Sequence, residues 1–206
     1  MKRLLIFLIA TIMLLSFVSC GEEDEDNVNY VEPPEEVEDL GDLVDLTEYR
    51  GLTVAQEAGE SRGDAIWRAV LEGSEVAEFP SPFLSYYESQ TLTKYKLLAD
   101  KADMSYTELL EALGLAEEDV KNEAKDLAKA ELVAMAIIEK ESILLTNEEI
   151  DRLFDRYAQK IAEELGKDVS YVKENLSDEV YDTMLRDKMI EFLITQNTFI
   201  TENEND

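Results

Sequence analysis

The sequence of 206 residues contains no histidine, a single cysteine and only 19 lysine and arginine residues. Without histidine, the chain lacks Ser-His-Asp and Cys-His catalysis, histidine-ligated zinc, and the side chain that ordinarily titrates near neutral pH. One cysteine, Cys20, forms neither an internal disulfide nor a cysteine-rich metal site. We therefore expect no catalytic residues, no metal site and no cofactor.

Charge is one-sided, because 48 acidic residues give a formal net charge of −29 and a pI near 4.1. This field repels polyanions, and phosphate recognition needs clustered basic side chains, so nucleic acid is excluded as a partner. Apolar residues nevertheless make up 45% of the sequence, which is enough for a folded core. Carboxylate pairs such as Glu148 and Glu149 lie in predicted first turns of helices, where capping explains them without a catalytic role.

The N-terminus has the pattern of an export signal. Lys2 and Arg3 precede fifteen uncharged, mostly apolar residues, 4–18, a run that is short for a membrane span of about 20 residues. An ordinary signal peptidase site before Cys20 is a poor fit, since Phe17 stands at the −3 position, where a small residue is preferred.

The string from Leu15 to Gly21, LSFVSCG, resembles the lipobox of bacterial lipoproteins, although Phe17 departs from the usual leucine. The resemblance implies that residues 1–19 are a lipoprotein signal peptide and that Cys20 becomes the lipidated first residue. The protein is then expected in the bacterial cell envelope, anchored to the membrane and facing outside the cytoplasm. An uncleaved anchor and a plain secreted protein remain as alternatives.

An acidic stretch follows the cysteine. Thirteen acidic residues and no basic one lie between Gly21 and Tyr49, together with the pair Pro33-Pro34. Such a segment buries too little apolar surface to offset its ordering entropy, and its charges repel one another. We expect residues 20–45 to be a disordered acidic tether and residues 46–63 to be an extended linker.

The rest of the sequence predicts an all-α, elongated multi-helix domain over residues 64–197, with at most one small strand pairing near Leu52–Val54. Capping boxes at Ser105–Glu108 and Thr146–Glu149 predict two helix starts. The predicted helices cover residues 64–76, 82–102, 105–113, 116–141, 146–165, a short piece from 170, and a last helix capped by Ser177. Residues 198–206 are expected to form a polar, frayed tail.

Several strings in this region resemble the C-terminal chaperone domain of trigger factor, which is similar also to SurA-type chaperone domains. They are Asp64–Val70, Ser74–Pro80, Leu113–Asp119, Ala136–Glu141, Thr146–Ile150 and Leu185–Leu193, and their order and spacing cover residues 65–197. The preceding Tyr49–Val54 resembles the segment that leads into the prolyl isomerase domain in that family. The resemblance implies a chaperone arm that binds unfolded polypeptides.

Two parts of the family pattern are missing. Only ten residues, Ala55–Asp64, stand where the isomerase domain is expected, and the upstream ribosome-binding domain is replaced by the signal and the acidic stretch. We therefore expect a non-enzyme: a lipid-anchored holdase for unfolded or newly exported polypeptides, with no small-molecule substrate. The alternative is a specific adaptor or scaffold lipoprotein that grips one envelope protein.

Client contact requires apolar surface, and the sequence is richest in aromatic residues just before and along the helix predicted over 82–102. The candidate client-binding residues are Phe79, Phe83, Tyr86, Tyr87, Tyr95, Met104 and Tyr106. Methionine adds an adaptable contact, which suits a binder of many clients. Core packing is the alternative role for each of them.

Overall fold

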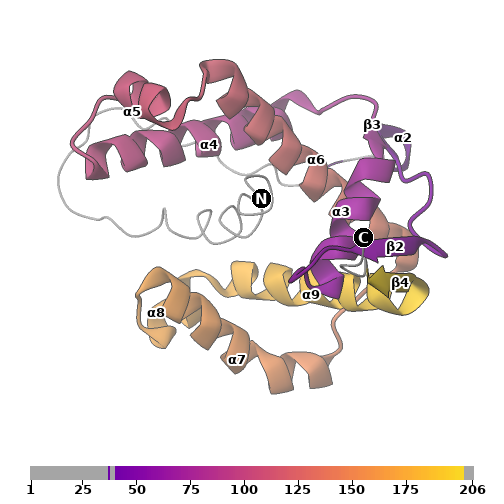
Figure 1. The fold of residues 1–206 in the computed structure, drawn as a ribbon. Helices are drawn as coiled ribbons and strands as arrows, with labels where there is room; N and C mark the ends of the chain where they lie inside the picture. Colours follow the sequence, from indigo (N-terminus) through magenta and orange to yellow (C-terminus); the bar gives the residue numbers. More distant parts are fainter. Residues whose placement is uncertain (1–36, 38–39, 202–206) are drawn as a thin grey trace. The chain divides into compact units, whose positions relative to one another are not determined.

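The computed structural model describes residue 37 and residues 40–201 (Figure 1). The predicted signal peptide, Cys20 and most of the predicted tether lie outside the described residues. Within the described chain, contacts separate two compact units, which we treat individually. Unit 1 comprises Glu78–Glu131, and unit 2 comprises Leu40–Ala77 together with residues 132–201.

Unit 1 is a set of three helical segments. They are α4 (Ser81–Lys101), α5 (Tyr106–Leu113) and the first part of α6 (Glu117–Glu141). The predicted capping box starts α5, because the Ser105 hydroxyl accepts the Glu108 N–H at 3.3 Å and the Glu108 carboxylate accepts the Ser105 N–H at 2.9 Å. Gly114 ends α5 in the left-handed region, with φ of 67°, as the sequence predicts.

Helices also dominate unit 2, which confirms the all-α prediction. They are α2 (Leu40–Leu43), α3 (Arg62–Gly73), the end of α6, α7 (Asn147–Leu165), α8 (Val169–Asn175) and α9 (Ser177–Gln196). The capping box of Thr146 and Glu149 begins α7, and Gly166 ends it with φ of 63°. The buried side of α9, formed by Val180, Met184, Met189 and Leu193, packs into the core of this unit.

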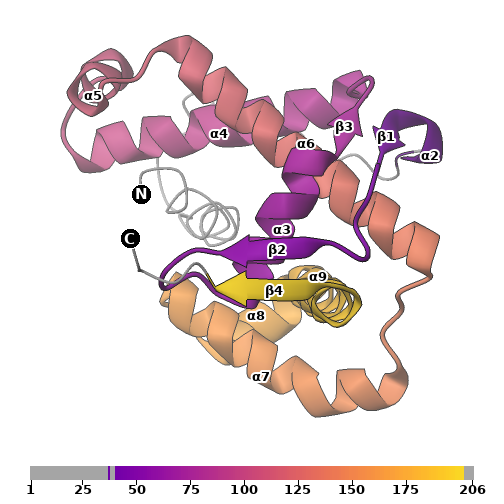
Figure 2. The same cartoon turned by 45° about the vertical axis from the view of Figure 1, so that its right-hand side comes forward.

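Unit 2 also contains two small sheets, where the sequence predicts one strand pairing at most. β1 (Val44–Asp45) pairs antiparallel with β3 (Glu75–Val76), and β2 (Thr53–Gln56) pairs parallel with β4 (Thr198–Thr201). β2 and β4 lie side by side in Figure 2, with Thr53 opposite Thr198. The prediction of a frayed tail is therefore wrong for residues 198–201, because β2 supplies their hydrogen-bonding partner.

The predicted boundary of the tether is also wrong at its C-terminal end. Residues 40–45 form α2 and β1, and the side chains of Leu40, Val44 and Leu46 are buried. Tyr49 and Val54 are buried as well, so the predicted linker 46–63 packs into unit 2 along much of its length. Apolar residues spaced among the acids therefore supply enough burial to order this stretch.

Two helix starts differ from the predicted ones. The N-cap of α3 is Ser61, not Asp64: the Ser61 hydroxyl accepts the Asp64 N–H at 3.1 Å and donates to the Asp64 carboxylate at 2.7 Å. At α9, Ser177 is the first helical residue, and the preceding Leu176 makes no side-chain cap. Leu176 is buried, so packing fixes this end where capping was predicted.

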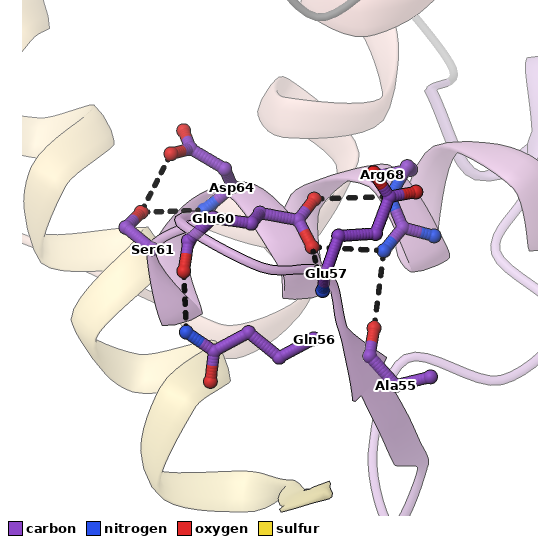
Figure 3. Close-up of polar contacts among 7 residues, drawn as sticks. All are labelled: Ala55, Gln56, Glu57, Glu60, Ser61, Asp64 and Arg68. Atoms are coloured by element: carbon purple, nitrogen blue, oxygen red, sulfur yellow. Dashed lines mark hydrogen bonds and ion pairs between the residues drawn. The ribbon is translucent and has the colours of Figure 1, made fainter. Parts of the chain in front are cut away.

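The joint between β2 and α3 is held by one ion pair (Figure 3). Arg68 reaches back from α3 and donates to both carboxylate oxygens of Glu60, at 3.1 and 3.0 Å, and to the carbonyl of Ala55 at 3.1 Å. The Glu60 carboxylate also accepts the backbone N–H of Glu57 at 3.0 Å. Residues 57–61 are therefore a short closed connection between the strand and the helix.

Candidate functional site

All seven candidate client-binding residues belong to unit 1 or its edge, but the structure places them in different environments. Phe83, Tyr87 and Tyr95 are buried, with exposed fractions of 4%, 7% and 8%. Phe79, Tyr86 and Tyr106 are half-buried, and Met104 is exposed. The sequence pattern therefore does not distinguish core residues from surface residues in this unit.

The three buried rings pack inside the unit. The Phe83 and Tyr87 ring centres are 5.1 Å apart in a tilted arrangement, and Tyr86 meets Tyr87 edge-on at 5.3 Å. Tyr95 belongs to the core cluster with Ala99 of the same helix and with side chains of α5 and α6. Surface contact with a client by Phe83, Tyr87 or Tyr95 is thus corrected to core packing in the folded unit.

Polar contacts fix α4 against α6. The Tyr95 hydroxyl donates to Glu123 at 2.7 Å, and the Lys94 ammonium donates to the other oxygen of the same carboxylate at 2.5 Å. Burial, followed by the hydrogen bond to Glu123, raises the pKa of Tyr95 strongly, so its hydroxyl stays protonated as a donor. These two contacts therefore hold α4 against α6 within unit 1.

The exposed large apolar side chains of unit 1 are Leu92, Leu97, Met104 and Leu113, which we name the exposed apolar set. Their exposed fractions run from 36% to 53%. Single apolar side chains are common on protein surfaces, so these four residues are candidate contacts with another molecule and do not by themselves define a continuous patch. Met104 also follows Asp103, which has φ of 52°, so it lies on a turn and not inside a helix.

Sequence reasoning missed the three leucines of this set. The buried stripe of α4 repeats every four residues through Phe83, Tyr87, Thr91, Tyr95 and Ala99. Leu92 is one residue from that stripe and Leu97 is two residues from it, which turns them by roughly 100° and 200° about the helix axis. The position of Leu92 and Leu97 relative to the buried stripe therefore indicates from the sequence alone that they face away from it.

Charged residues are frequent in unit 1, with twelve acidic and six basic residues between Glu78 and Glu131. Phe79, at the edge of the unit, lies under a cation, with the Lys125 nitrogen 5.3 Å from its ring centre. Apolar contacts with a charged surround allow a surface to bind apolar polypeptide while the protein itself remains in solution.

No cluster of three or more His, Cys, Asp or Glu side chains in residues 40–201 has the geometry to hold a metal ion. Among the helices that the structure describes, none combines the length and the apolar character needed to cross a membrane.

Comparison with known proteins gives one match. The family model described as bacterial trigger factor protein (TF) C-terminus matches residues 55–195. No curated protein and no solved structure matches the chain. The family match spans more than half of the sequence and confirms the resemblance that the strings between Asp64 and Leu193 predict.

Proposed function

Since the chain belongs to the family of bacterial trigger factor C-terminal domains, we propose that it is a lipid-anchored holdase outside the cytoplasm. Its clients are unfolded or newly exported polypeptides, which it binds without chemical change. The family match covers the chaperone arm, and this supports polypeptide binding at a coarse level. The exposed apolar set of unit 1 is the observation that carries the more specific proposal.

The exposed apolar set suits clients of varied sequence. Leucine and methionine side chains make contacts that depend on area and not on direction, and methionine adapts its shape to its partner. The half-buried Phe79, Tyr86 and Tyr106 add aromatic edges in the same unit, and we keep them as candidate client contacts. A net charge of −29 keeps a loaded complex soluble and steers basic clients.

The lipid anchor is proposed from the sequence, because Cys20 lies outside the described residues. Its support is the position of the only cysteine, directly after a fifteen-residue apolar run and directly before an acidic stretch. Lipidation with two or more acyl chains anchors a protein stably, whereas one chain gives reversible binding. In this proposal the acidic segment between Gly21 and Asp39 is the linker between the anchor and the folded units, and its like charges keep those units away from an anionic membrane surface.

We further propose that the protein does not catalyse prolyl isomerisation. In support, only residues 57–61 connect β2 with α3, and the Glu60–Arg68 pair closes that connection. The measurement is the refolding of a proline-limited protein, which should keep its uncatalysed time scale of tens of seconds. Acceleration at substoichiometric amounts of the chaperone overturns this part of the proposal.

The holdase proposal is tested by light scattering of an aggregating client in the presence of the chain from residue 20 onward. Removal of residues 1–19 takes away no part of the described structure. The combined variant Leu92→Gln, Leu97→Gln and Leu113→Gln should lose most of the delay, because glutamine keeps helix propensity while removing apolar contact. Its circular dichroism and melting temperature should stay close to those of the wild type.

The matched control is Lys96→Gln with Lys101→Gln. It changes two exposed residues of α4, the helix of Leu92 and Leu97, without removing apolar side chains. This control should keep the delay of a neutral client. Equal activity of the triple variant and the wild type rules out the exposed apolar set as the client surface. If the wild type protects no client, and a pulldown from envelope extracts instead recovers one stoichiometric partner, the adaptor hypothesis replaces the holdase proposal.

A further inference from the structure

A polar pocket of about 410 Å³ lies between α7 and α9, wholly within unit 2. It is separate from the exposed apolar set of unit 1. Its lining residues are Leu145, Glu149, Arg152, Leu153, Arg156, Tyr157, Met184, Asp187, Lys188 and Glu191. Three cations and three carboxylates therefore face one cavity and their formal charges balance, so the hydrogen bonds decide which groups still have donors or acceptors to offer.

Two of the three carboxylates are already engaged. Glu149 accepts from the Lys188 ammonium at 2.7 Å and from both the backbone N–H and the hydroxyl of Thr146. The hydrogen bond from Lys188, followed by those from Thr146, lowers the pKa of Glu149 to about 2. Asp187 accepts the Tyr157 hydroxyl at 2.7 Å. Burial, followed by this hydrogen bond, raises the pKa of Tyr157 to about 12.

The two arginines have unused donors. Among residues 40–201, neither Arg152 nor Arg156 forms an ion pair with a carboxylate. Arg156 lies over the Tyr157 ring at 5.5 Å, and a hydrogen bond from Arg156 partly offsets the rise in the pKa of Tyr157, so Arg156 keeps its other N–H donors. Each guanidinium carries five N–H donors, and Glu191 is the one lining carboxylate with no hydrogen bond or ion pair in that range. The guanidinium donors of Arg152 and Arg156 therefore exceed the acceptors left in this pocket, which favours an acceptor-rich group such as a carboxylate.

Part of the wall of this pocket is apolar. Leu145, Leu153 and Met184 line it beside the arginines. The neighbouring Leu144 is 72% exposed, and its carbonyl accepts from Lys188, so it is held next to the cavity. A ligand that fills this site thus needs a carboxylate and an apolar group close to each other.

We propose that the α7–α9 pocket is a second polypeptide-binding site, selective for client segments in which Asp or Glu adjoins an aliphatic or aromatic residue. This inference rests on the proposed holdase function and adds a client class that the net charge alone disfavours. At 0.15 M salt, screening over about 8 Å weakens the repulsion by distant acidic residues. Arg152 and Arg156 are exposed, but a charge-assisted hydrogen bond acts at contact distance, so the same salt weakens it less than the long-range repulsion.

The chain's own acidic stretch offers similar chemistry, and we assign the pocket to clients instead. The densest acidic run, Glu22–Asp26, contains no apolar residue, but Val31-Glu32 and Glu36-Val37-Glu38 place an acid beside an aliphatic residue as the proposed client segments do. An experimental arm therefore separates the two sources. In that arm, the nine acidic residues between Glu22 and Glu38 are replaced by serine and glutamine in the chain from residue 20 onward.

The test is fluorescence anisotropy with three labelled peptides that differ only in Glu, Gln or Lys at the positions beside leucine. The Glu peptide should bind most tightly at 0.15 M salt. Arg152→Gln and Arg156→Gln should each weaken it by roughly ten-fold, since one charge-assisted hydrogen bond has about that effect. Lys160→Gln is the matched control: this exposed residue follows Arg156 by one turn but does not line the pocket, and its change should be under about two-fold.

A variant that should increase the affinity for the Glu peptide provides a second test. Glu191→Gln removes the one unengaged lining carboxylate, so it should tighten binding of the Glu peptide. Glu174→Gln removes an exposed carboxylate of α8 outside the pocket and should leave the affinity nearly unchanged. Equal binding of the Glu and Gln peptides, or equal effects of Arg152→Gln and Lys160→Gln, overturns the proposal.

The remaining outcomes are equally decisive. If neutralising the nine acidic residues between Glu22 and Glu38 strengthens peptide binding ten-fold or more, the chain's own acidic stretch is the occupant and the client assignment is wrong. If the protein delays aggregation but ignores the Glu peptide, the pocket proposal fails alone. If it binds the Glu peptide through Arg152 and Arg156 but protects no client, the holdase function fails while the site stands.

Discussion

Replacing Arg68 by methionine should destabilise unit 2 more than the loss of an ordinary surface ion pair. The Glu60 side chain is only 1% exposed, and Arg68 supplies two of the three hydrogen bonds to its carboxylate. Methionine keeps much of the apolar stem of arginine, but it leaves the Glu60 carboxylate buried with the Glu57 N–H as its one remaining hydrogen-bond donor. The variant therefore retains the cost of burying a charge while losing the partner that offsets it.

The magnitude follows from that environment. Breaking a buried ion pair by removing one partner costs about 3–5 kcal/mol, and the 29% exposure of the Arg68 side chain places this case at the lower end. We expect a loss of about 3 kcal/mol in the free energy of unfolding. For a protein of this size that corresponds to a fall in the melting temperature of roughly 6–12 °C.

The assay is urea unfolding of a double-mutant cycle, since urea does not screen charge. Glu60→Gln should cost less than Arg68→Met, because it removes the buried charge together with the ion pair. The double variant should be more stable than the sum of the two single losses indicates, with a coupling energy of about 1–3 kcal/mol. Additive losses, or a cost below about 1 kcal/mol for Arg68→Met, refute this account of the joint.

The pH dependence gives an independent check. The hydrogen bonds from Arg68 lower the pKa of Glu60 in the folded state, so this group stabilises the fold above its unfolded pKa near 4.3 and loses that contribution as the pH falls through the folded value. In Arg68→Met the burial remains without the partner, and the pKa of Glu60 should rise. The stability difference between wild type and variant should therefore be largest near pH 7 and shrink at about pH 4.

Two other substitutions test a buried group and the proposed anchor. Thr91→Val should raise the free energy of unfolding by about 1 kcal/mol in a melting experiment, because the Thr91 hydroxyl is buried at 2% exposure with no hydrogen-bond partner among the described residues; a loss of stability shows that the hydroxyl has a partner after all. Cys20→Ala should abolish labelling by a fatty-acid probe and leave an unprocessed or released protein, and persistent labelling excludes Cys20 as the lipidation site.

Local signals in the sequence were sufficient for most helices. The capping boxes at Ser105–Glu108 and Thr146–Glu149 and the closing glycines at 114 and 166 act within a few residues, so the sequence determines them without tertiary information. The family strings between Asp64 and Leu193 were recognisable for the same reason, because they are runs of helix patterns and caps in fixed order. The lack of histidine likewise excluded whole classes of catalysis before any fold was known.

Long-range packing decided the rest. β2 and β4 are 145 positions apart at Thr53 and Thr198, and nothing local in the tail indicates that a partner strand exists. Phe83 and Leu92 both read as apolar helix residues, yet only the packing of α4 against its neighbours makes one core and the other surface. The unused donors of Arg152 also appear only when α7 meets α9, because helix spacing fixes which residues share a face but not what that face meets.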